Sequence, residues 1–509
     1  MSLPPQQQND LAAPGKKTTV DKDLRRFGQL TKAGRGISRS HINLGYGLLF
    51  LLIVWAFAYT LTGAGGDNSI IIVAAIVGAY MAMNIGANDV ANNVGPAVGS
   101  KALTMVGALF IAAIFEAGGA MIAGGEVVST ISKSIVSPDA FADKSVFIWA
   151  MMAALLSAAL WVNLATMIGA PVSTTHSIVG GVLGAGVTAA GLSAVDWFVM
   201  AKIAASWVIS PVLGGVIAAL FLAFIKFTIL YRDDKLEAAK RWVPVLVAIM
   251  AAAFSGYLVM KGLKRIWKPD AFMIAGIAAA AFLATYLTVR ARIARAAETL
   301  ENRRRSVGEL FTVPLICAAA LLSFAHGSND VANAVGPLAA IVNAVTSGAV
   351  AAKVTLPFWV LAIGAIGISV GLMLYGPKII QVVGEKITRL NRVRAFCVAL
   401  SASITVIIAS TLGLPVSSTH IAVGAVFGVG FLREFLTNRR LGIPSAPLGN
   451  SEPRVNPRSE KALNRWAKAR KRKLVRRRHI MTIVGAWLIT VPASALLASA
   501  IYFAVRTFV

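Results

Sequence analysis

Two copies of one polar segment decide how this chain folds: Gly86-Ala87-Asn88-Asp89-Val90-Ala91-Asn92-Asn93-Val94-Gly95-Pro96 and Gly327-Ser328-Asn329-Asp330-Val331-Ala332-Asn333-Ala334-Val335-Gly336-Pro337. Nine of the eleven positions are identical. A second pair follows, Gly169-Ala170-Pro171-Val172-Ser173-Thr174-Thr175-His176 and Gly413-Leu414-Pro415-Val416-Ser417-Ser418-Thr419-His420. Polar residues beside Gly and Pro in apolar surroundings predict broken membrane helices, and a matched copy in each half is typical of secondary transporters. We therefore predict a site for a small charged species near the middle of a bilayer.

The composition also predicts a membrane protein. Of the 509 residues, 57% are hydrophobic and only 14% are charged, and the mean hydropathy is +0.72, which is outside the range of ordinary soluble proteins. The first apolar run follows about forty polar residues without a small-residue cleavage site, so we interpret it as a retained span. Runs of spanning length include Tyr46–Leu61, Val146–Ile168, Phe198–Leu230, Ala271–Val289, Phe358–Tyr375 and Met481–Val505.

The net charge of +27 gathers in segments beside these apolar runs. The richest are the N-terminal tail, Arg290–Arg305 and Arg454–Arg478. The positive-inside rule and the attraction of anionic lipid head groups explain such a distribution. No aromatic-interleaved binding module accompanies the charge, so we predict membrane lipids and not nucleic acid as the partner.

Periodicity and helix breakers predict an all-α polytopic membrane protein with about 12–13 membrane segments, in two inverted repeats with broken helices and re-entrant-type hairpins. A count of crossings from a cytoplasmic N-terminus starts the repeats on opposite sides and keeps both basic loops cytoplasmic. In chain order we predict a cytoplasmic basic tail (1–43), an extra membrane helix and turn (44–68), the first repeat (69–195), connecting helices with a cytoplasmic linker (196–309), the second repeat (310–436), a basic cytoplasmic loop (437–479) and a last membrane helix (480–509).

Asp89 and Asp330 carry charge where an isolated carboxylate is costly. Carboxylate and amide oxygens together are ligands that a hard cation such as Na⁺ prefers, while amide N–H groups can face an anion. The alternative is that the polar side chains only cap broken helices and bond between helices, which two matched copies make less favourable. The predicted ligands of a coupling cation are Asp89, Asn92, Asp330 and Asn333, and those of an anionic substrate include Asn88 and Asn329.

The second motif places hydroxyl groups after a proline, where a helix commonly begins. The free N–H groups at such a helix start bind anions without a buried Arg or Lys. The alternative is an ordinary helix cap. The predicted substrate ligands here are Ser173, Thr174, Thr175, Ser417, Ser418 and Thr419.

Three further side chains have weaker signals. His176 and His420 follow the hydroxyl residues, and local capping or pairing explains them better than a proton relay. Glu116 lies in an apolar run and is interpreted either as a coupling residue or as a partner of Lys101.

These residues resemble the inorganic phosphate transporter family known as PiT, whose signature is a duplicated Gly-x-Asn-Asp-x-x-Asn segment. Gly86–Ser100 and Phe324–Ala340 fit the signature, and Pro171–His176 and Pro415–His420 fit the family's Pro-x-Ser-x-Thr-His segments. The resemblance covers about residues 69–436. It implies an inverted-repeat symporter that takes up phosphate with Na⁺ or H⁺ and can form a homodimer. Na⁺-coupled animal members carry a glutamate where this chain has Ala399, so that residue's role does not transfer.

We therefore predict a secondary active transporter that imports inorganic phosphate with a cation gradient. Two oxygen-rich carboxylate sites, with no buried Arg or Lys in either motif, favour Na⁺, with at least two ions per phosphate. The alternatives are an H⁺-coupled symporter of phosphate or metal phosphate, and a sulfate permease of the same family.

Other functional classes fit less well. A membrane-embedded hydrolase using the two aspartates would need a nucleophile–base pair or a His cluster, and neither is evident. A channel would lack coupling. We predict no enzyme activity, no cofactor apart from the coupling ion, and a multi-pass location in the plasma (inner) membrane with a cytoplasmic N-terminus.

Overall fold

The computed structural model describes residues 19–63, 65–170, 172–262, 269–347, 356–386, 390–440 and 477–508. Its contacts divide the chain into two units, Met1–Phe50 and Leu51–Val509. The described part of the first unit is helical, so the predicted tail 1–43 is a helix from Thr19 onward. Residues 1–18, Pro171, residues 263–268 and most of the predicted loop 437–479 lie outside the described residues.

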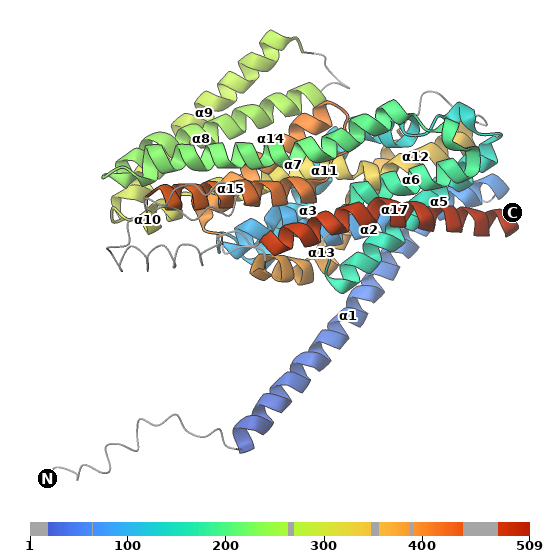
Figure 1. The fold of residues 1–509 in the computed structure, drawn as a ribbon, viewed down its shortest axis with the longest axis horizontal. Helices are drawn as coiled ribbons and strands as arrows, with labels where there is room; N and C mark the ends of the chain where they lie inside the picture. Colours follow the sequence, from blue (N-terminus) through green and yellow to red (C-terminus); the bar gives the residue numbers. More distant parts are fainter. Residues whose placement is uncertain are drawn as a thin grey trace, which may run out of the picture. The chain divides into compact units, whose positions relative to one another are not determined.

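The described residues are almost entirely helical (Figure 1). The only strand-like pairing among them is one antiparallel bridge between Val136 and Val195. In chain order the α-helices are α1 (Thr19–Thr62), α2 (Gly66–Gly99), α3 (Met105–Ala123), α4 (Gly125–Ser129), α5 (Lys144–Ile168), α6 (Thr174–Ala190), α7 (Trp197–Ile225), α8 (Lys235–Tyr257), α9 (Ala271–Glu298), α10 (Arg304–Leu310), α11 (Thr312–Asp330), α12 (Ala332–Ser347), α13 (Phe358–Lys386), α14 (Arg392–Thr411), α15 (Ser418–Arg440) and α17 (Arg477–Phe508). Short π- or 3₁₀-helical turns are η1 (Thr130–Ser134), η2 (Pro138–Ala140), η3 (Leu192–Ala194), η4 (Lys226–Leu230) and η5 (Leu258–Gly262).

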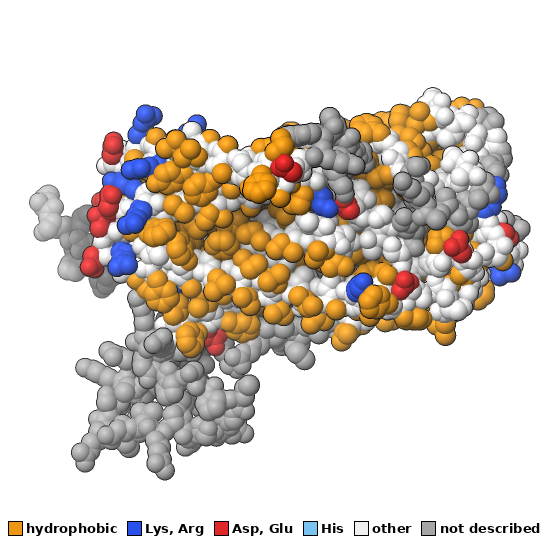
Figure 2. All heavy atoms as spheres, turned by 90° about the horizontal axis from the view of Figure 1, so that it is seen from above, with side chains coloured by type: hydrophobic (Ala, Val, Ile, Leu, Met, Phe, Trp, Pro, Cys, Tyr) orange, Lys and Arg blue, Asp and Glu red, His pale blue; other side chains and the backbone are white. Residues whose placement is uncertain are grey.

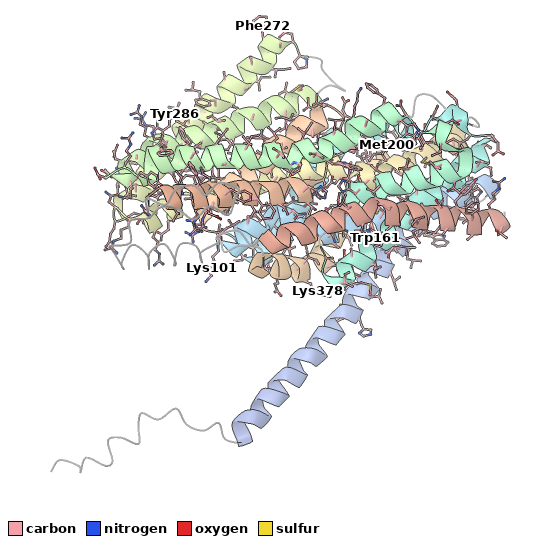
Figure 3. The ribbon with its side chains drawn as sticks, viewed as in Figure 1. Lys101, Trp161, Met200, Phe272, Tyr286 and Lys378 are labelled. Carbon is pink, nitrogen blue, oxygen red and sulfur yellow. The ribbon has the colours of Figure 1, made fainter. Side chains whose placement is uncertain are left out.

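Twelve helical segments of the described residues are long and apolar enough to span a membrane, which confirms the predicted polytopic all-α class. The most apolar window of Thr312–Ser347 is 89% buried within the protein and that of Asn68–Gly99 is 72% buried, whereas that of Ala271–Glu298 is 0% buried. Helices α2, α11 and α12 therefore form the core, and α9 lies at the periphery. Figure 3 shows Phe272, which is 89% exposed, at the outer end of α9.

The outer surface is apolar. Large side chains such as Val208, Leu220 and Leu496 are well exposed. Figure 2 shows hydrophobic side chains over much of the visible face, with Lys and Arg gathered toward one end. An exposed apolar surface of this extent fits contact with lipid chains and not with water. The protein is therefore a multi-span membrane protein.

Motif glycines let the core helices approach closely. A Cβ atom at Gly86 in α2 would collide with the carbonyl oxygen of Ile368 in α13, and one at Gly327 in α11 would collide with that of Glu116 in α3. Only glycine fits such a backbone contact. The two contacts also establish that Ile368 and Glu116 occupy equivalent positions in the two halves.

The predicted helix break in the first motif is wrong. Helix α2 continues from Gly66 to Gly99 through Asp89, with Pro96 inside it. A proline removes one backbone hydrogen bond, and here the close packing of α2 outweighs that loss. In the second copy the helix does divide at Val331, between α11 and α12. The inverted orientation of the repeats stays a prediction.

The C-terminal helix α17 packs against the core of the protein. It packs along α6 of the first repeat, just as α7 packs along α15 of the second. Glycines permit both contacts, because a Cβ at Gly184 would strike the backbone of Ala495, and one at Gly428 would strike that of Gly215. Each half therefore covers the hydroxyl-bearing helix of the other half.

Candidate functional site

All twelve predicted site residues lie in the interior of the second unit. They are carried by α2, by α11 and α12, and by the first turns of α6 and α15. None is more than 7% exposed. Helices that are far apart in sequence thus bring the two acidic segments and the two hydroxyl segments together, as the sequence predicted.

Each aspartate accepts a hydrogen bond from a hydroxyl group of its own half. The Thr174 hydroxyl donates to Asp89 Oδ2 at 2.9 Å. The Ser418 hydroxyl donates to Asp330 Oδ2 at 3.0 Å. Hydrogen bonds to a charged acceptor are stronger than neutral ones, so the two matched pairs stabilise both buried carboxylates.

The two halves are also bonded to each other. Asn92 Nδ2 donates to Thr419 Oγ1 at 2.8 Å, and Asn333 Nδ2 donates to Thr175 Oγ1 at 3.1 Å. The Thr419 hydroxyl in turn donates to Asp89 Oδ1 at 3.0 Å. The carboxylate of the first half therefore contacts hydroxyl groups from both halves.

Asn88 and Asn329 hold the segments that precede the hydroxyl residues. Asn88 Nδ2 lies 3.0 Å from Thr166 Oγ1 and donates to the Ala170 carbonyl at 3.4 Å. Asn329 Nδ2 makes the equivalent contacts, at 3.0 Å to Ser410 Oγ and 3.1 Å to the Leu414 carbonyl. In this structure their amide N–H groups hold the backbone just before each hydroxyl segment.

Two of the predicted substrate hydroxyls act as helix caps. Ser173 Oγ accepts from the His176 N–H at 3.1 Å, and Ser417 Oγ accepts from the His420 N–H at 3.3 Å. The alternative interpretation as a cap therefore describes these two serines. The four other hydroxyls bond to residues of other segments: those of Thr174, Ser418 and Thr419 donate to the aspartates, and that of Thr175 donates to the Val416 carbonyl in the loop before α15.

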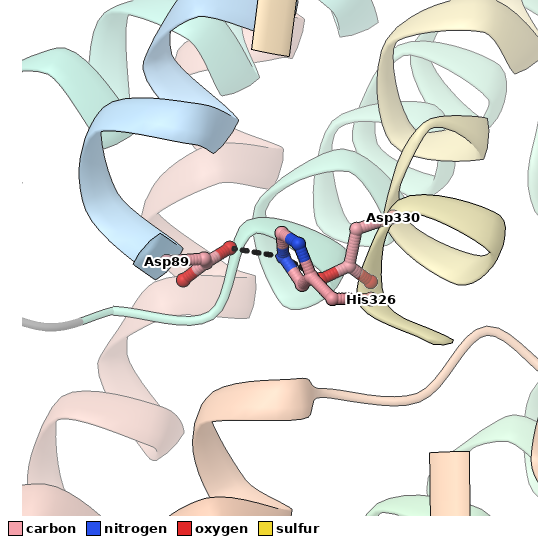
Figure 4. A group of neighbouring side chains, drawn as sticks. All are labelled: Asp89, His326 and Asp330. Carbon is pink, nitrogen blue, oxygen red and sulfur yellow. Dashed lines mark ion pairs between the residues drawn. The ribbon is translucent and has the colours of Figure 1, made fainter. Parts of the chain in front are cut away.

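His326 is the main site residue that sequence reasoning missed. Its Nε2 lies 2.8 Å from Asp330 Oδ2 and 3.7 Å from Asp89 Oδ2, so the imidazole lies between the two carboxylates (Figure 4). It directly precedes the second motif copy and lies one helical turn before Asp330. A lone His at that spacing in an otherwise apolar helix was the available signal.

Glu116 completes this charged cluster. Its Oε2 lies 3.1 Å from His326 Nδ1, and its Oε1 accepts from Asn93 Nδ2 at 2.8 Å. Glu116 is fully buried, whereas Lys101 is exposed, so a Glu116–Lys101 pair is not formed. Of the two interpretations, the one that places Glu116 at the site has structural support.

His176 and His420 meet where the two halves join. Their ring centroids are 4.4 Å apart, and the Trp207 ring of α7 contacts His176 edge-on at 3.8 Å. Trp207 Nε1 also donates to the Pro415 carbonyl at 3.2 Å. The contact between the two rings and the bonds from both backbone N–H groups to Ser173 and Ser417 fit the local pairing or capping predicted for both residues.

Oxygen atoms suited to a cation are present at the site. Asp330 Oδ1 and Asn333 Oδ1 are buried and have no hydrogen-bond partner among the described residues. A buried acceptor without a donor is unfavourable unless a cation or water satisfies it. The residues therefore fit a bound cation.

The chain is similar to known proteins over most of its length. The model of the phosphate transporter family matches residues 85–498, a range that contains every residue of the site. A candidate phosphate permease of Helicobacter pylori strain J99 is 47% identical over 528 residues, covering 95% of this chain and 98% of that protein. A candidate phosphate permease of Pyrococcus abyssi is 39% identical over 360 residues, or 70% of this chain and 88% of that protein.

A solved structure is also similar. It is described as the sodium-dependent phosphate transporter, is 34% identical in sequence, and aligns with a TM-score of 0.74. The alignment covers 87% of this chain and all of that chain.

Proposed function

The chain belongs to the phosphate transporter family, and we propose that it imports inorganic phosphate as a symporter driven by Na⁺. The observation that carries this proposal is the pair of buried aspartates, each bonded to a hydroxyl group at a helix start. Phosphate would bind to those hydroxyls and to the free N–H groups of α6 and α15. Na⁺ would bind to Asp89, Asn92, Asp330 and Asn333.

The hydroxyl groups provide a physical basis for coupling. Thr174 and Ser418 each have one O–H proton, which is donated to a carboxylate in this structure. When a cation binds the carboxylate, the hydroxyl is free to rotate and donate to a phosphate oxygen. Cation binding would therefore prepare the phosphate site, and phosphate without the cation would have to compete with the carboxylates for the same protons.

Two observations favour Na⁺ over H⁺. The carboxylate, amide and hydroxyl oxygens form the shell of a hard metal cation, whereas a proton needs only one carboxylate. The similar solved structure is described as sodium-dependent. Two carboxylate sites are consistent with at least two Na⁺ ions per phosphate.

Uptake of labelled phosphate into proteoliposomes tests the proposal, with Na⁺ and pH gradients imposed separately. We expect an inward Na⁺ gradient to drive accumulation at equal pH on both sides. Accumulation that persists when choline replaces Na⁺, yet disappears when the pH gradient is dissipated, would establish H⁺ coupling instead. Excess unlabelled sulfate should not compete, and effective competition by sulfate would identify a sulfate permease.

The finer points of location and assembly are part of the same proposal. The transporter would lie in the plasma (inner) membrane with its N-terminus in the cytoplasm, because the basic segments 291–309 and 437–479 would then also be cytoplasmic. Membrane lipids, or a second copy of the chain, would cover peripheral helices such as α9. Accessibility of single cysteines to an impermeant reagent tests the orientation, and crosslinking in native membranes tests the homodimer.

A further inference from the structure

The charged cluster between the two halves has the donor set of a transition-metal site. One oxygen of Asp89, one nitrogen of His326 and one oxygen of Asp330 all lie within 4.8 Å of one another. All three side chains are at most 1% exposed. Figure 4 shows the imidazole between the two carboxylates.

A carboxylate fixes the orientation of the imidazole. Glu116 Oε2 lies 3.1 Å from Nδ1, and Asn93 fixes the other Glu116 oxygen. A metal-binding His usually has a carboxylate beside its second ring nitrogen, which leaves the other nitrogen free to bind the ion. Here that other nitrogen is Nε2, the atom directed at Asp89 and Asp330.

Hydroxyl groups hold the two aspartates in place. Thr174 and Ser418 each donate to one carboxylate oxygen. Asp330 Oδ1 is buried and has no hydrogen-bond partner among the described residues. This oxygen belongs to the carboxylate whose Oδ2 contacts Nε2, so the carboxylate keeps an unused acceptor for a cation.

We propose that Asp89, His326 and Asp330 bind one divalent transition-metal ion of the Zn²⁺ class, and that this ion competes with the coupling cation. An imidazole nitrogen suits Zn²⁺ and similar ions, whereas Na⁺ and Mg²⁺ prefer oxygen alone. On binding, the ion takes the lone pair of Nε2, and a proton carried by that nitrogen is released to the solvent. The imidazole is then neutral with its remaining N–H at Nδ1 beside Glu116, and the two positive charges of the ion offset the negative charges of Asp89 and Asp330. The competition, but not the binding, rests on the proposed Na⁺ coupling, since both ions would use the same aspartates.

Binding of Zn²⁺ alone to the purified full-length chain tests this site without any transport assay. The protein carries no polyhistidine tag, is placed in lipid nanodiscs, and is dialysed against radioactive Zn²⁺ in phosphate-free choline buffer. We expect one tightly bound Zn²⁺ per chain. His326→Gln should remove it, and Glu116→Gln should weaken it about 10–100-fold because the orienting carboxylate is lost. His176→Gln is the matched control, since its buried imidazole contacts rings and should leave Zn²⁺ binding as in wild type.

Several results would overturn the proposal: no bound Zn²⁺ in the wild type, equal binding by wild type and His326→Gln, or equal loss in His176→Gln. If His326→Gln does not elute as a folded protein, Glu116→Gln is the test, and an unchanged affinity of that variant for Zn²⁺ would also overturn the proposal. Added Na⁺ should release Zn²⁺ from the wild type, and retention of Zn²⁺ at saturating Na⁺ would refute the competition. Phosphate uptake with a chelator present is measured separately, so failure of phosphate symport is distinguishable from failure of the metal site.

Discussion

The two halves of the molecule share several hydrogen bonds at their motifs but differ in the charged residues around them. Asp89 and Asp330 have equivalent hydroxyl donors, and Asn88 and Asn329 hold equivalent hairpins. The charged cluster, however, contains three polar side chains whose equivalents by motif position and helix contact are apolar. His326 corresponds to Ile85, Glu116 to Ile368 and Asn93 to Ala334, and all six are buried.

The helix packing that both halves share is therefore independent of the charged residues at the site. The scaffold depends on glycines and hydroxyl groups, which both halves retain. The charge asymmetry makes the two aspartates unequal, because the imidazole lies 2.8 Å from Asp330 and 3.7 Å from Asp89. In a transporter with two identical halves, the two carboxylates would have the same neighbours and the same electrostatic environment.

The largest expected effect comes from removing either carboxylate. Asp89→Asn and Asp330→Asn should each reduce concentrative phosphate uptake at least about 100-fold, because losing one member of a buried charged group costs about 3–5 kcal/mol and each 1.4 kcal/mol is tenfold. Labelled-phosphate uptake into proteoliposomes measures this. Asp139→Asn, at an exposed position, is the control and should transport normally. Normal uptake by either core variant would remove that aspartate from the coupling site.

A second experiment removes the asymmetry itself. His326→Ile alone should destabilise the protein by about 3 kcal/mol or more, because Glu116 stays buried without its charged partner. The triple variant Asn93→Ala, Glu116→Ile, His326→Ile reproduces the apolar residues of the other half and should recover most of that stability. Thermal unfolding in detergent measures both. If the triple variant is no more stable than the single one, the helix packing that both halves share depends on the three polar residues of the cluster.

The third comparison separates the two kinds of hydroxyl. Thr174→Ala and Ser418→Ala should each raise the KM for phosphate about 10-fold or more, because a hydrogen bond to a charged group contributes about 1.5–3 kcal/mol. Ser173→Ala and Ser417→Ala should instead lower stability by about 1 kcal/mol through loss of a helix cap. Uptake kinetics and thermal unfolding are measured on all four variants. An equal rise in KM for the capping serines would show that they also contact phosphate.

The smallest effect concerns the contact between halves made by α7. Trp207→Phe keeps a ring against His176 but loses the hydrogen bond to the Pro415 carbonyl, a change of about 1 kcal/mol in unfolding free energy. Trp197→Phe is the matched control, because its indole donates to the Leu192 carbonyl at an exposed position and should change stability less. Equal unfolding temperatures for the two variants would show that the Trp207 bond does not connect the halves.

Much of this molecule could be predicted from the sequence. Apolar runs of spanning length indicate membrane helices because unpaired backbone groups cannot face lipid. Acidic and hydroxyl residues in two matched copies indicated the site, because polar groups in such surroundings are costly unless they have a role. All twelve predicted residues do lie together in the core.

The detailed roles of these residues could not be predicted in this way. Asn88 and Asn329 are predicted substrate ligands, and the structure adds that their amide N–H groups contact the backbone just before the hydroxyl segments. Their contact with a substrate stays a prediction. The first motif was expected to break its helix, yet Gly86 serves close packing and α2 continues. In each case the outcome depends on which neighbour lies against the motif.

The sequence by itself determined the membrane class, the duplication and the chemical character of the site, since these follow from hydropathy, composition and local spacing. Only the tertiary structure decided that His326 lies between Asp89 and Asp330 with Glu116 behind it. Glu116 and His326 are far apart in the chain and meet because Gly327 lets α11 press against α3. Spacing along one helix defines a face of that helix, but the partner of that face is set by how the helices pack.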